Sequence, residues 1–209
     1  MKENEKNNQK MYYRMLGGTG LQVSVLSFGF WATYGVKEGL INEEGILKAK
    51  ECMQIAREKG INLFDNAETY GNPVGAAEEI MGEAMSQLQK EDPETWRRSE
   101  IIVSTKIFWG GSGVNESGLS RKHINEGLDS SLRRLQVNYV DLLFCHRPDP
   151  FTPTDTIVRG MTDIVRSGRA TAWGTSEWSA QQITEAYWIA IMQGLEPPQF
   201  EQPHYNMLK

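Results

Sequence analysis

Residues 61–71 read INLFDNAETYG, a short apolar run that ends in a group of polar side chains. The apolar part is typical of a buried β-strand. Asp65 and Tyr70 follow where this strand is expected to end, so the strand would position a carboxylate and a phenol. The segments on either side, 43–60 and 76–90, carry apolar residues at helical spacing. The chain is therefore predicted to run helix, strand, helix through this region.

The same alternation continues toward the C-terminus. Before residue 43, two short runs around the turn GGTG (17–20) predict a β-hairpin that leads into a first core strand over residues 23–30. Nearly continuous apolar strands that alternate with helices indicate a parallel sheet covered on both faces. Further strands are expected over 101–108, 139–146, 170–176 and from 199, and further helices over 120–136, with Ser120 as N-cap, 153–169 and 179–194.

Two architectures fit this pattern, an open doubly wound sheet and a (β/α)8 TIM barrel. A dinucleotide-binding open sheet concentrates its chemistry at a glycine-rich turn, and no GxGxxG follows the first strand. A barrel gathers its chemistry at the carboxyl ends of many strands. We predict an α/β fold, a (β/α)8 TIM barrel that is incomplete, with about six of its eight strands and an N-terminal β-hairpin. The polar residues that end the predicted strands are Asp65, Lys106, His146, Ser176 and Gln202.

Composition excludes several classes of protein. With 209 residues, a net charge of −5 and no dense basic patch, the chain is not expected to bind nucleic acid. Its apolar runs fall short of the roughly 20 residues that a membrane helix needs, so no direct membrane insertion is expected. Residues 1–11 are predicted to form a disordered polar tail, and residues 12–209 one domain. Neither Cys52 nor Cys145 shows metal-ligand spacing, so we expect no metal site, reduced thiols and a cytoplasmic protein.

Three of the strand-end residues, together with Tyr70 five positions after Asp65, could act together if they meet at one barrel mouth. Tyrosine has a pKa of about 10 and gives up its proton poorly at neutral pH. The ammonium of Lys106 would lower the pKa of Tyr70, and Asp65 would hold that lysine charged and in place. His146 would orient a substrate carbonyl by hydrogen bonding. This set predicts that Tyr70 is a general acid that protonates an alkoxide while a nicotinamide cofactor supplies hydride.

Four stretches resemble the aldo-keto reductase superfamily, and in particular the branch of the voltage-gated potassium channel beta subunits and their microbial and plant relatives. They are FDNAETYG (64–71), STKIFWGG (104–111), residues 119–150 and WGTSEWS (173–179). The resemblance implies a (β/α)8 barrel that binds NADP(H). It also implies a catalytic tetrad of Asp65, Tyr70, Lys106 and His146.

The resemblance implies cofactor contacts as well. Ser176 and Gln202 would hold the nicotinamide carboxamide, and Asp65 would lie beside the cofactor. Gly29, Phe30 and Trp31 would line the mouth shared by cofactor and substrate. In the family, a loop after the seventh strand cradles the pyrophosphate, and that loop would follow residue 209. We therefore expect a fragment or truncated product that binds NADPH weakly or not at all, with open sheet edges that need a cover.

Two functions remain open at this point. The first is NADPH-dependent reduction of small aldehydes and ketones to alcohols. The alternative is a non-catalytic, cofactor-sensing beta subunit of a voltage-gated potassium channel, with the channel as partner. A second copy of this chain, as a homo-oligomer, is a further candidate partner. Several animal channel subunits carry Asn where His146 stands, which favours the reductase for this chain.

Several other aromatic and histidine side chains are assigned mainly structural roles. Trp96, Trp173 and Trp188 are predicted to be packing residues, and His123 a structural histidine. Trp109, before a glycine pair, fits a substrate-loop aromatic and a loop anchor equally well.

Overall fold

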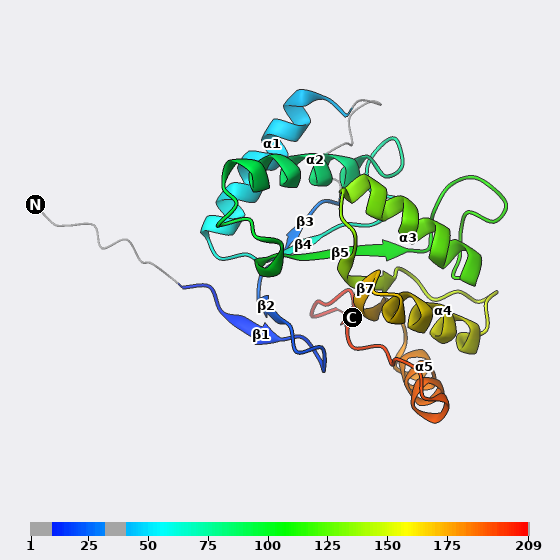
Figure 1. Ribbon diagram of the computed structural model, residues 1–209. Helices are drawn as coiled ribbons and strands as arrows, with labels where there is room; N and C mark the ends of the chain where they lie inside the picture. The colour runs from blue at the N-terminus through cyan, green and yellow to red at the C-terminus, as the bar shows by residue number, and fades with distance from the viewer. Residues whose placement is uncertain (1–9, 32–40, 209) are drawn as a thin grey trace, which may run out of the picture.

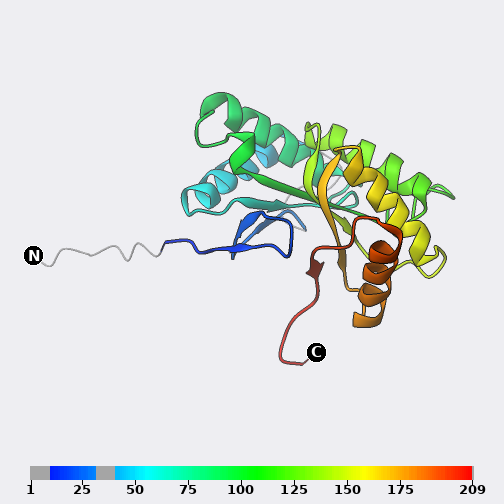
Figure 2. The same cartoon turned by 60° about the horizontal axis from the view of Figure 1, so that its bottom comes forward.

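The computed structural model describes residues 10–31 and 41–208. Six parallel strands form one curled sheet, in which each strand pairs with the next along the chain (Figure 1). The helices lie along one face of this sheet, and Figure 2 shows the strands beneath them. This architecture confirms the prediction of an incomplete (β/α)8 barrel with six strands. The strands are β3 (Phe28–Gly29), β4 (Leu63–Asp65), β5 (Ile102–Ile107), β6 (Val140–Cys145), β7 (Ala170–Ser176) and β8 (Glu201–Gln202), and the helices are α1 (Glu43–Glu58), α2 (Ala76–Glu91), the 3-10 helix η1 (Arg98–Glu100), α3 (Arg121–Leu135), α4 (Thr154–Arg166) and α5 (Ala180–Gln193).

The predictions on the N-terminal tail, membrane helices and metal sites can be compared only with the residues that the structure describes. The disordered tail predicted for residues 1–11 falls mostly on residues 1–9, which lie outside the described residues. The domain boundary at residue 12 stays a prediction. Within the described part of the chain, no helix is both long and apolar enough to cross a membrane. The same residues contain no group of three or more His, Cys, Asp or Glu side chains that could hold a metal ion.

The N-terminal hairpin consists of β1 (Tyr13–Met15) and β2 (Gln22–Ser24), which pair antiparallel. The first core strand predicted over residues 23–30 is wrong in its extent, because β2 ends at Ser24 and β3 alone enters the barrel sheet. The chain turns between the two strands, where the Ser24 hydroxyl donates a hydrogen bond to the Leu26 carbonyl at 2.6 Å. One apolar run thus supplies strands to two different sheets.

Side chains at alternate positions of each strand point into the barrel. Leu63, Ile102 and Leu142, from three neighbouring strands, form an interior apolar layer, and the hairpin residue Val23 packs against it. The side chains between them face the helices and belong to the main core. The alternation that builds the core therefore also gathers polar side chains at one end of the interior. These are Asp65, Lys106, His146, Ser176 and Gln202, which follow at inward positions toward the carboxyl ends of the strands.

Three helices begin at side chains that satisfy their free backbone N–H groups. Asn42 accepts a hydrogen bond from the N–H of Gly45 at the start of α1. The predicted N-cap of α3 is confirmed, because the Ser120 hydroxyl accepts from the His123 N–H at 3.1 Å. Ser179 begins α5 with a capping box. Such caps set where each helix starts and so fix the lengths of the strand-to-helix loops above the barrel.

The three tryptophans assigned to packing do not behave alike. Trp96 and Trp173 are buried, as predicted. Trp188 is 57% exposed, so that prediction is wrong. The reason lies in the orientation of α5, which turns Ala186 and Ala190 toward the core and leaves Trp188 on its outer face.

Gly174 lies in β7, where the ring of Phe200 crosses it. A Cβ at this position would lie 2.1 Å from Phe200 Cδ2, so Gly174→Ala forces backbone or ring to move. We expect the variant to lose about 1–3 kcal/mol of unfolding free energy, measured by urea denaturation. Gly29→Ala is the control, because a Cβ there meets no atom of the described residues within 4 Å. Equal losses in both variants would contradict the steric explanation.

Candidate active site

A buried ion pair occupies the carboxyl ends of β4 and β5. The Lys106 ammonium lies 2.7 Å from Oδ1 and 2.6 Å from Oδ2 of Asp65, and its third hydrogen bond goes to the Asn66 carbonyl at 2.7 Å. The Ser104 hydroxyl donates to Asp65 Oδ1 at 2.6 Å. The Lys106 side chain is fully buried. Burial lowers the pKa of Lys106, and the charge of Asp65 and its hydrogen bond oppose that shift.

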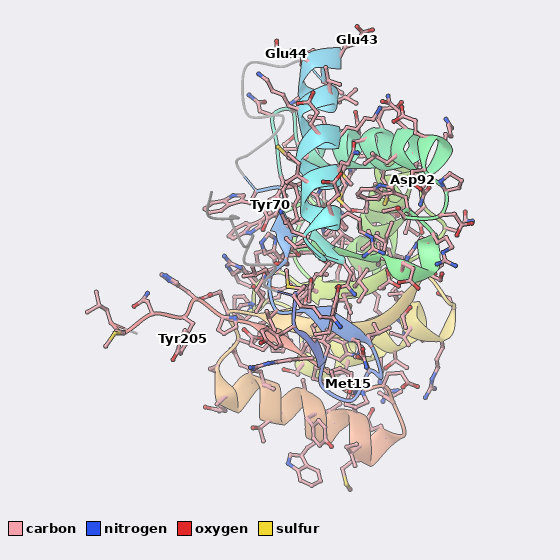
Figure 3. All side chains as sticks on the ribbon, turned by 90° about the vertical axis from the view of Figure 1, so that its left-hand side faces the viewer. Met15, Glu43, Glu44, Tyr70, Asp92 and Tyr205 are labelled. Atoms are coloured by element: carbon pink, nitrogen blue, oxygen red, sulfur yellow. The ribbon has the colours of Figure 1, made fainter. Side chains whose placement is uncertain are left out.

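Tyr70 lies directly beside this pair. The Lys106 ammonium is 5.0 Å from the centroid of the Tyr70 ring, and the edge of the His146 ring meets Tyr70 with centroids 5.7 Å apart. Figure 3 shows Tyr70 near the tip of the β3 arrow, at the carboxyl end of the sheet. No hydrogen bond joins the Tyr70 hydroxyl to Lys106 among the described residues, because all three ammonium protons go to Asp65 and Asn66.

The pKa of Tyr70 therefore differs from the sequence expectation, in which Lys106 lowers it. Burial raises the pKa of Tyr70, the Asp65 carboxylate raises it further, and Arg147 acts in the opposite direction. Since Asp65 already neutralises Lys106, the lysine does not draw the phenol toward ionisation. Tyr70 thus holds its proton at neutral pH, as a proton donor must.

His146 is buried just beyond β6, and its Nδ1 has no hydrogen-bond partner among the described residues. Burial lowers the pKa of His146 to about 3, and the positive charges of Lys106 and Arg147 add to the effect. The imidazole is therefore neutral across the physiological range. A neutral imidazole has one N–H donor and one acceptor nitrogen, which suits it to bind a carbonyl oxygen.

A cavity of about 470 Å³ opens above these side chains. It is surrounded by three aromatic rings, the His146 imidazole and one guanidinium. Trp31 reaches it from the end of β3, with its ring centroid 6.4 Å from that of Tyr70. Trp109 reaches it from the loop after β5 and packs edge-on against Phe108. Trp109 thus lines the cavity and is about half exposed, and its role toward a substrate stays a prediction. The full lining is Trp31, Thr69, Tyr70, Gly71, Asn72, Trp109, His146 and Arg147.

The residues predicted to contact a cofactor are brought to the same end of the barrel. Ser176 and Gln202 are register partners on β7 and β8, and the Ser176 hydroxyl donates to the Gln202 carbonyl at 3.0 Å. Gly29 is the register partner of Asp65. Phe30 is buried, and Trp31 is 73% exposed at the cavity edge. Their roles toward a cofactor stay predictions.

Comparison with known proteins identifies the family of this chain. The model of the Aldo/keto reductase family matches residues 25–209. The chain belongs to the aldo/keto reductase family. Two of its relatives carry the name "Probable voltage-gated potassium channel subunit beta": one from Arabidopsis thaliana, 53% identical, and one from Oryza sativa subsp. japonica, 52% identical. Each match covers 94% of this chain and 56% of the relative, so the chain spans little more than half the length of these proteins.

Sequence reasoning missed two residues that shape this aldo/keto reductase site, and Glu68 is the first. The buried Glu68 carboxylate accepts hydrogen bonds from the N–H groups of Phe108 at 2.6 Å and Gly110 at 3.0 Å, on either side of Trp109. His123 binds the same oxygen from α3 at 3.2 Å, and it is buried, in keeping with its structural assignment. The signal was a carboxylate inside the strand-end stretch, but its partners lie about 40 residues away.

Arg147 was missed as well. It lines the cavity and donates hydrogen bonds from Nη1 to the carbonyl of His146 and to the Ser176 hydroxyl, at 3.4 Å for the second. Its sequence signal was only its position next to His146. Arg147 thus joins the ends of β6 and β7 while its guanidinium borders the cavity.

The depressed pKa of His146 makes the protein less stable in acid. Unfolded histidine titrates near pH 6.5. Between about pH 3 and 6.5 the unfolded chain therefore binds more protons than the folded one. The stability linked to neutral His146 is present above that window and is lost as pH falls through it. Between pH 6.5 and 4.5 we expect the wild type to lose about 2 kcal/mol more unfolding free energy than His146→Gln.

Urea denaturation across this pH range measures the difference. His204→Gln is the matched control, because His204 is exposed near the C-terminus. The control should follow the wild-type curve. Parallel curves for the wild type and His146→Gln would show that His146 is not held neutral by its surroundings.

Proposed function

We propose that this chain carries the catalytic site of an NADPH-dependent reductase of aldehydes and ketones. One observation carries the proposal: an ion pair between the fully buried Lys106 and the largely buried Asp65 lies beside Tyr70 and His146, which line one cavity. Burying such a pair is costly, and it is retained where it positions or tunes a neighbouring group. Here the neighbouring group is a protonated phenol that faces a substrate-sized cavity.

Each residue has a defined task in this reaction. Neutral His146 donates a hydrogen bond to the substrate carbonyl and so orients it beside Tyr70. The Tyr70 hydroxyl protonates the alkoxide oxygen as negative charge develops there. The Lys106 ammonium, held by Asp65, lies 5.0 Å from the centroid of the Tyr70 ring, so this ion pair fixes the position from which the phenol gives up its proton.

The residues present fit a nicotinamide ring. The Ser176 hydroxyl and the Gln202 side chain, side by side on β7 and β8, supply the donors and acceptors that a carboxamide needs. No atom of the described residues lies within 4 Å of a Cβ at Gly29, beside Asp65, which leaves room for a flat ring. NADPH supplies the hydride when bound. The choice of NADP over NAD, and a cytoplasmic location, rest on the family resemblance.

A second function is supported by the names of the relatives. Both the Arabidopsis and the rice protein are named as channel beta subunits, so a voltage-gated potassium channel is a candidate partner. In that role the same site would sense the redox state of the cofactor. The two functions differ in whether the bound cofactor turns over.

The test measures NADPH oxidation by the 209-residue chain with 4-nitrobenzaldehyde, alongside NADPH binding by tryptophan fluorescence. Trp31 and Trp109 line the cavity and supply the signal. We expect aldehyde-dependent oxidation that is absent in Lys106→Met. NADPH binding without any aldehyde-dependent turnover would contradict the reductase and favour the channel subunit.

A further inference from the structure

Arg147 sets the charge of the cavity. Among the residues that line the cavity it is the only one that carries a permanent charge. The nearby Lys106 charge is already neutralised, because both oxygens of Asp65 bind its ammonium. Arg147 has no such partner: no carboxylate among the described residues lies within ion-pair distance of its guanidinium. Among the described residues, the positive charge of Arg147 at the cavity is therefore not balanced by a carboxylate.

The hydrogen bonds of Arg147 leave most of its donors available. Only Nη1 is engaged, by the His146 carbonyl and the Ser176 hydroxyl. None of the described residues accepts a hydrogen bond from Nε or Nη2. The two bonds hold the guanidinium at the strand ends, so its orientation is set before a ligand arrives. A planar guanidinium that is already in place binds a carboxylate with two parallel hydrogen bonds.

The nearby carboxylates have other partners. Asp149, two residues further on, accepts hydrogen bonds from the N–H of Leu119 and from the Thr152 hydroxyl. Glu177, next to Ser176, accepts from the His204 N–H. Glu68 holds the Trp109 loop. The described part of the chain thus supplies no carboxylate to Arg147, and the carboxylate of a ligand can take that place.

We propose that Arg147 makes the cavity selective for carbonyl compounds that also carry a carboxylate, such as oxo acids and aldehyde acids. The inference rests on the proposed reductase function of the same site. Tyr70 and His146 receive the carbonyl, and Arg147, at the same cavity wall, receives the carboxylate. The aromatic rings of Trp31 and Trp109 would cover the carbon skeleton between the two groups.

The first test compares two aldehydes that differ only in charge: 4-formylbenzoate and its methyl ester, methyl 4-formylbenzoate. The measured quantity is the ratio of kcat/KM for the acid to that for the ester, taken within each variant. We expect the wild type to favour the acid, and Arg147→Gln to lower the ratio by about 10-fold. Arg147→Lys keeps the charge but loses the planar fork, so its ratio should fall between the two.

Arg159→Gln is the matched control. It removes the same charge from the outer surface of α4, where Arg159 pairs with Asp155. Its acid-to-ester ratio should equal that of the wild type. Circular dichroism of every variant confirms that it is folded, and Arg147→Lys serves if Arg147→Gln is not.

A second readout does not depend on turnover. Benzoate and benzamide have the same shape, and their binding to the chain is followed by tryptophan fluorescence. We expect Arg147→Gln to raise the Kd of benzoate about 10-fold, with no comparable change for benzamide. Benzoate binding should also weaken as salt concentration rises.

The outcomes separate the inference from the proposed function. If the ester is reduced but neither the acid-to-ester ratio nor the benzoate Kd changes in Arg147→Gln, the inference is overturned and the reductase stands. If neither aldehyde is reduced while benzoate binding still depends on Arg147, the reductase fails and anion recognition stands. A weaker NADPH affinity with an unchanged ratio would assign Arg147 to a cofactor phosphate and overturn the inference.

Discussion

Tyr70→Phe is expected to lower kcat/KM for aldehyde reduction by at least about 10²-fold, because it removes the proton donor and keeps the ring. The ring contacts with His146 and Trp31 remain, so the cavity should keep its shape. The Kd of NADPH, from tryptophan fluorescence, should barely change. Steady-state NADPH oxidation with 4-nitrobenzaldehyde measures the loss of rate.

Tyr187→Phe is the control for this substitution, because Tyr187 lies half-exposed on α5, away from the cavity lining. It should reduce aldehyde at the wild-type rate. Unaltered turnover in Tyr70→Phe would refute Tyr70 as the general acid. A fall in NADPH affinity to match the fall in rate would instead make Tyr70 a binding residue.

Asp65→Asn should strongly destabilise the fold, because it leaves the fully buried Lys106 ammonium without its counter-charge. Breaking a buried pair from one side typically costs about 3–5 kcal/mol. Replacing both partners, in Asp65→Asn with Lys106→Met, should restore much of the loss, since both charges of this pair are then removed. Urea denaturation of the wild type, both single variants and the double variant completes the cycle.

Asp155→Asn is the surface counterpart, since the Asp155–Arg159 pair on α4 is about half exposed. Water screens such a pair, so its loss should change stability far less than the loss of Asp65. Additive losses in the double variant at residues 65 and 106 would show that the two buried groups do not interact.

Most of the barrel could be predicted from sequence, because its elements follow local periodicity. The α2 prediction, 76–90, differs by one residue from Ala76–Glu91, since apolar spacing and a charged helix end are properties of the segment itself. The prediction of the first core strand was wrong because it too rested on local periodicity. Periodicity marks residues 23–30 as extended but does not say which strand each half pairs with. That choice depends on the hydrogen bonds of Ser24 and on the distant strand β4.

The candidate site likewise has features that could be predicted from sequence and features that could not. Polar residues at successive strand ends were visible in the sequence, and parallel pairing alone brings Asp65 and Lys106 to one edge. The proton state of Tyr70 could not be read from the sequence. The sequence predicted a lowered pKa from a neighbouring lysine, whereas burial and Asp65 raise it. Whether the pKa of Tyr70 is raised or lowered depends on which acceptors bind the protons of Lys106. That is decided by the distances between these groups in the folded chain.

The sequence by itself determined the elements, their order, and the set of polar residues at the barrel mouth, because these depend on neighbours within a few positions along the chain. Only the tertiary structure decided how those residues share protons and charge. Glu68 holds the Trp109 loop across about 40 residues, and Arg147 borders the cavity without a counter-ion among the described residues. Such roles arise from contacts between distant segments and from exclusion of water, which no local pattern records.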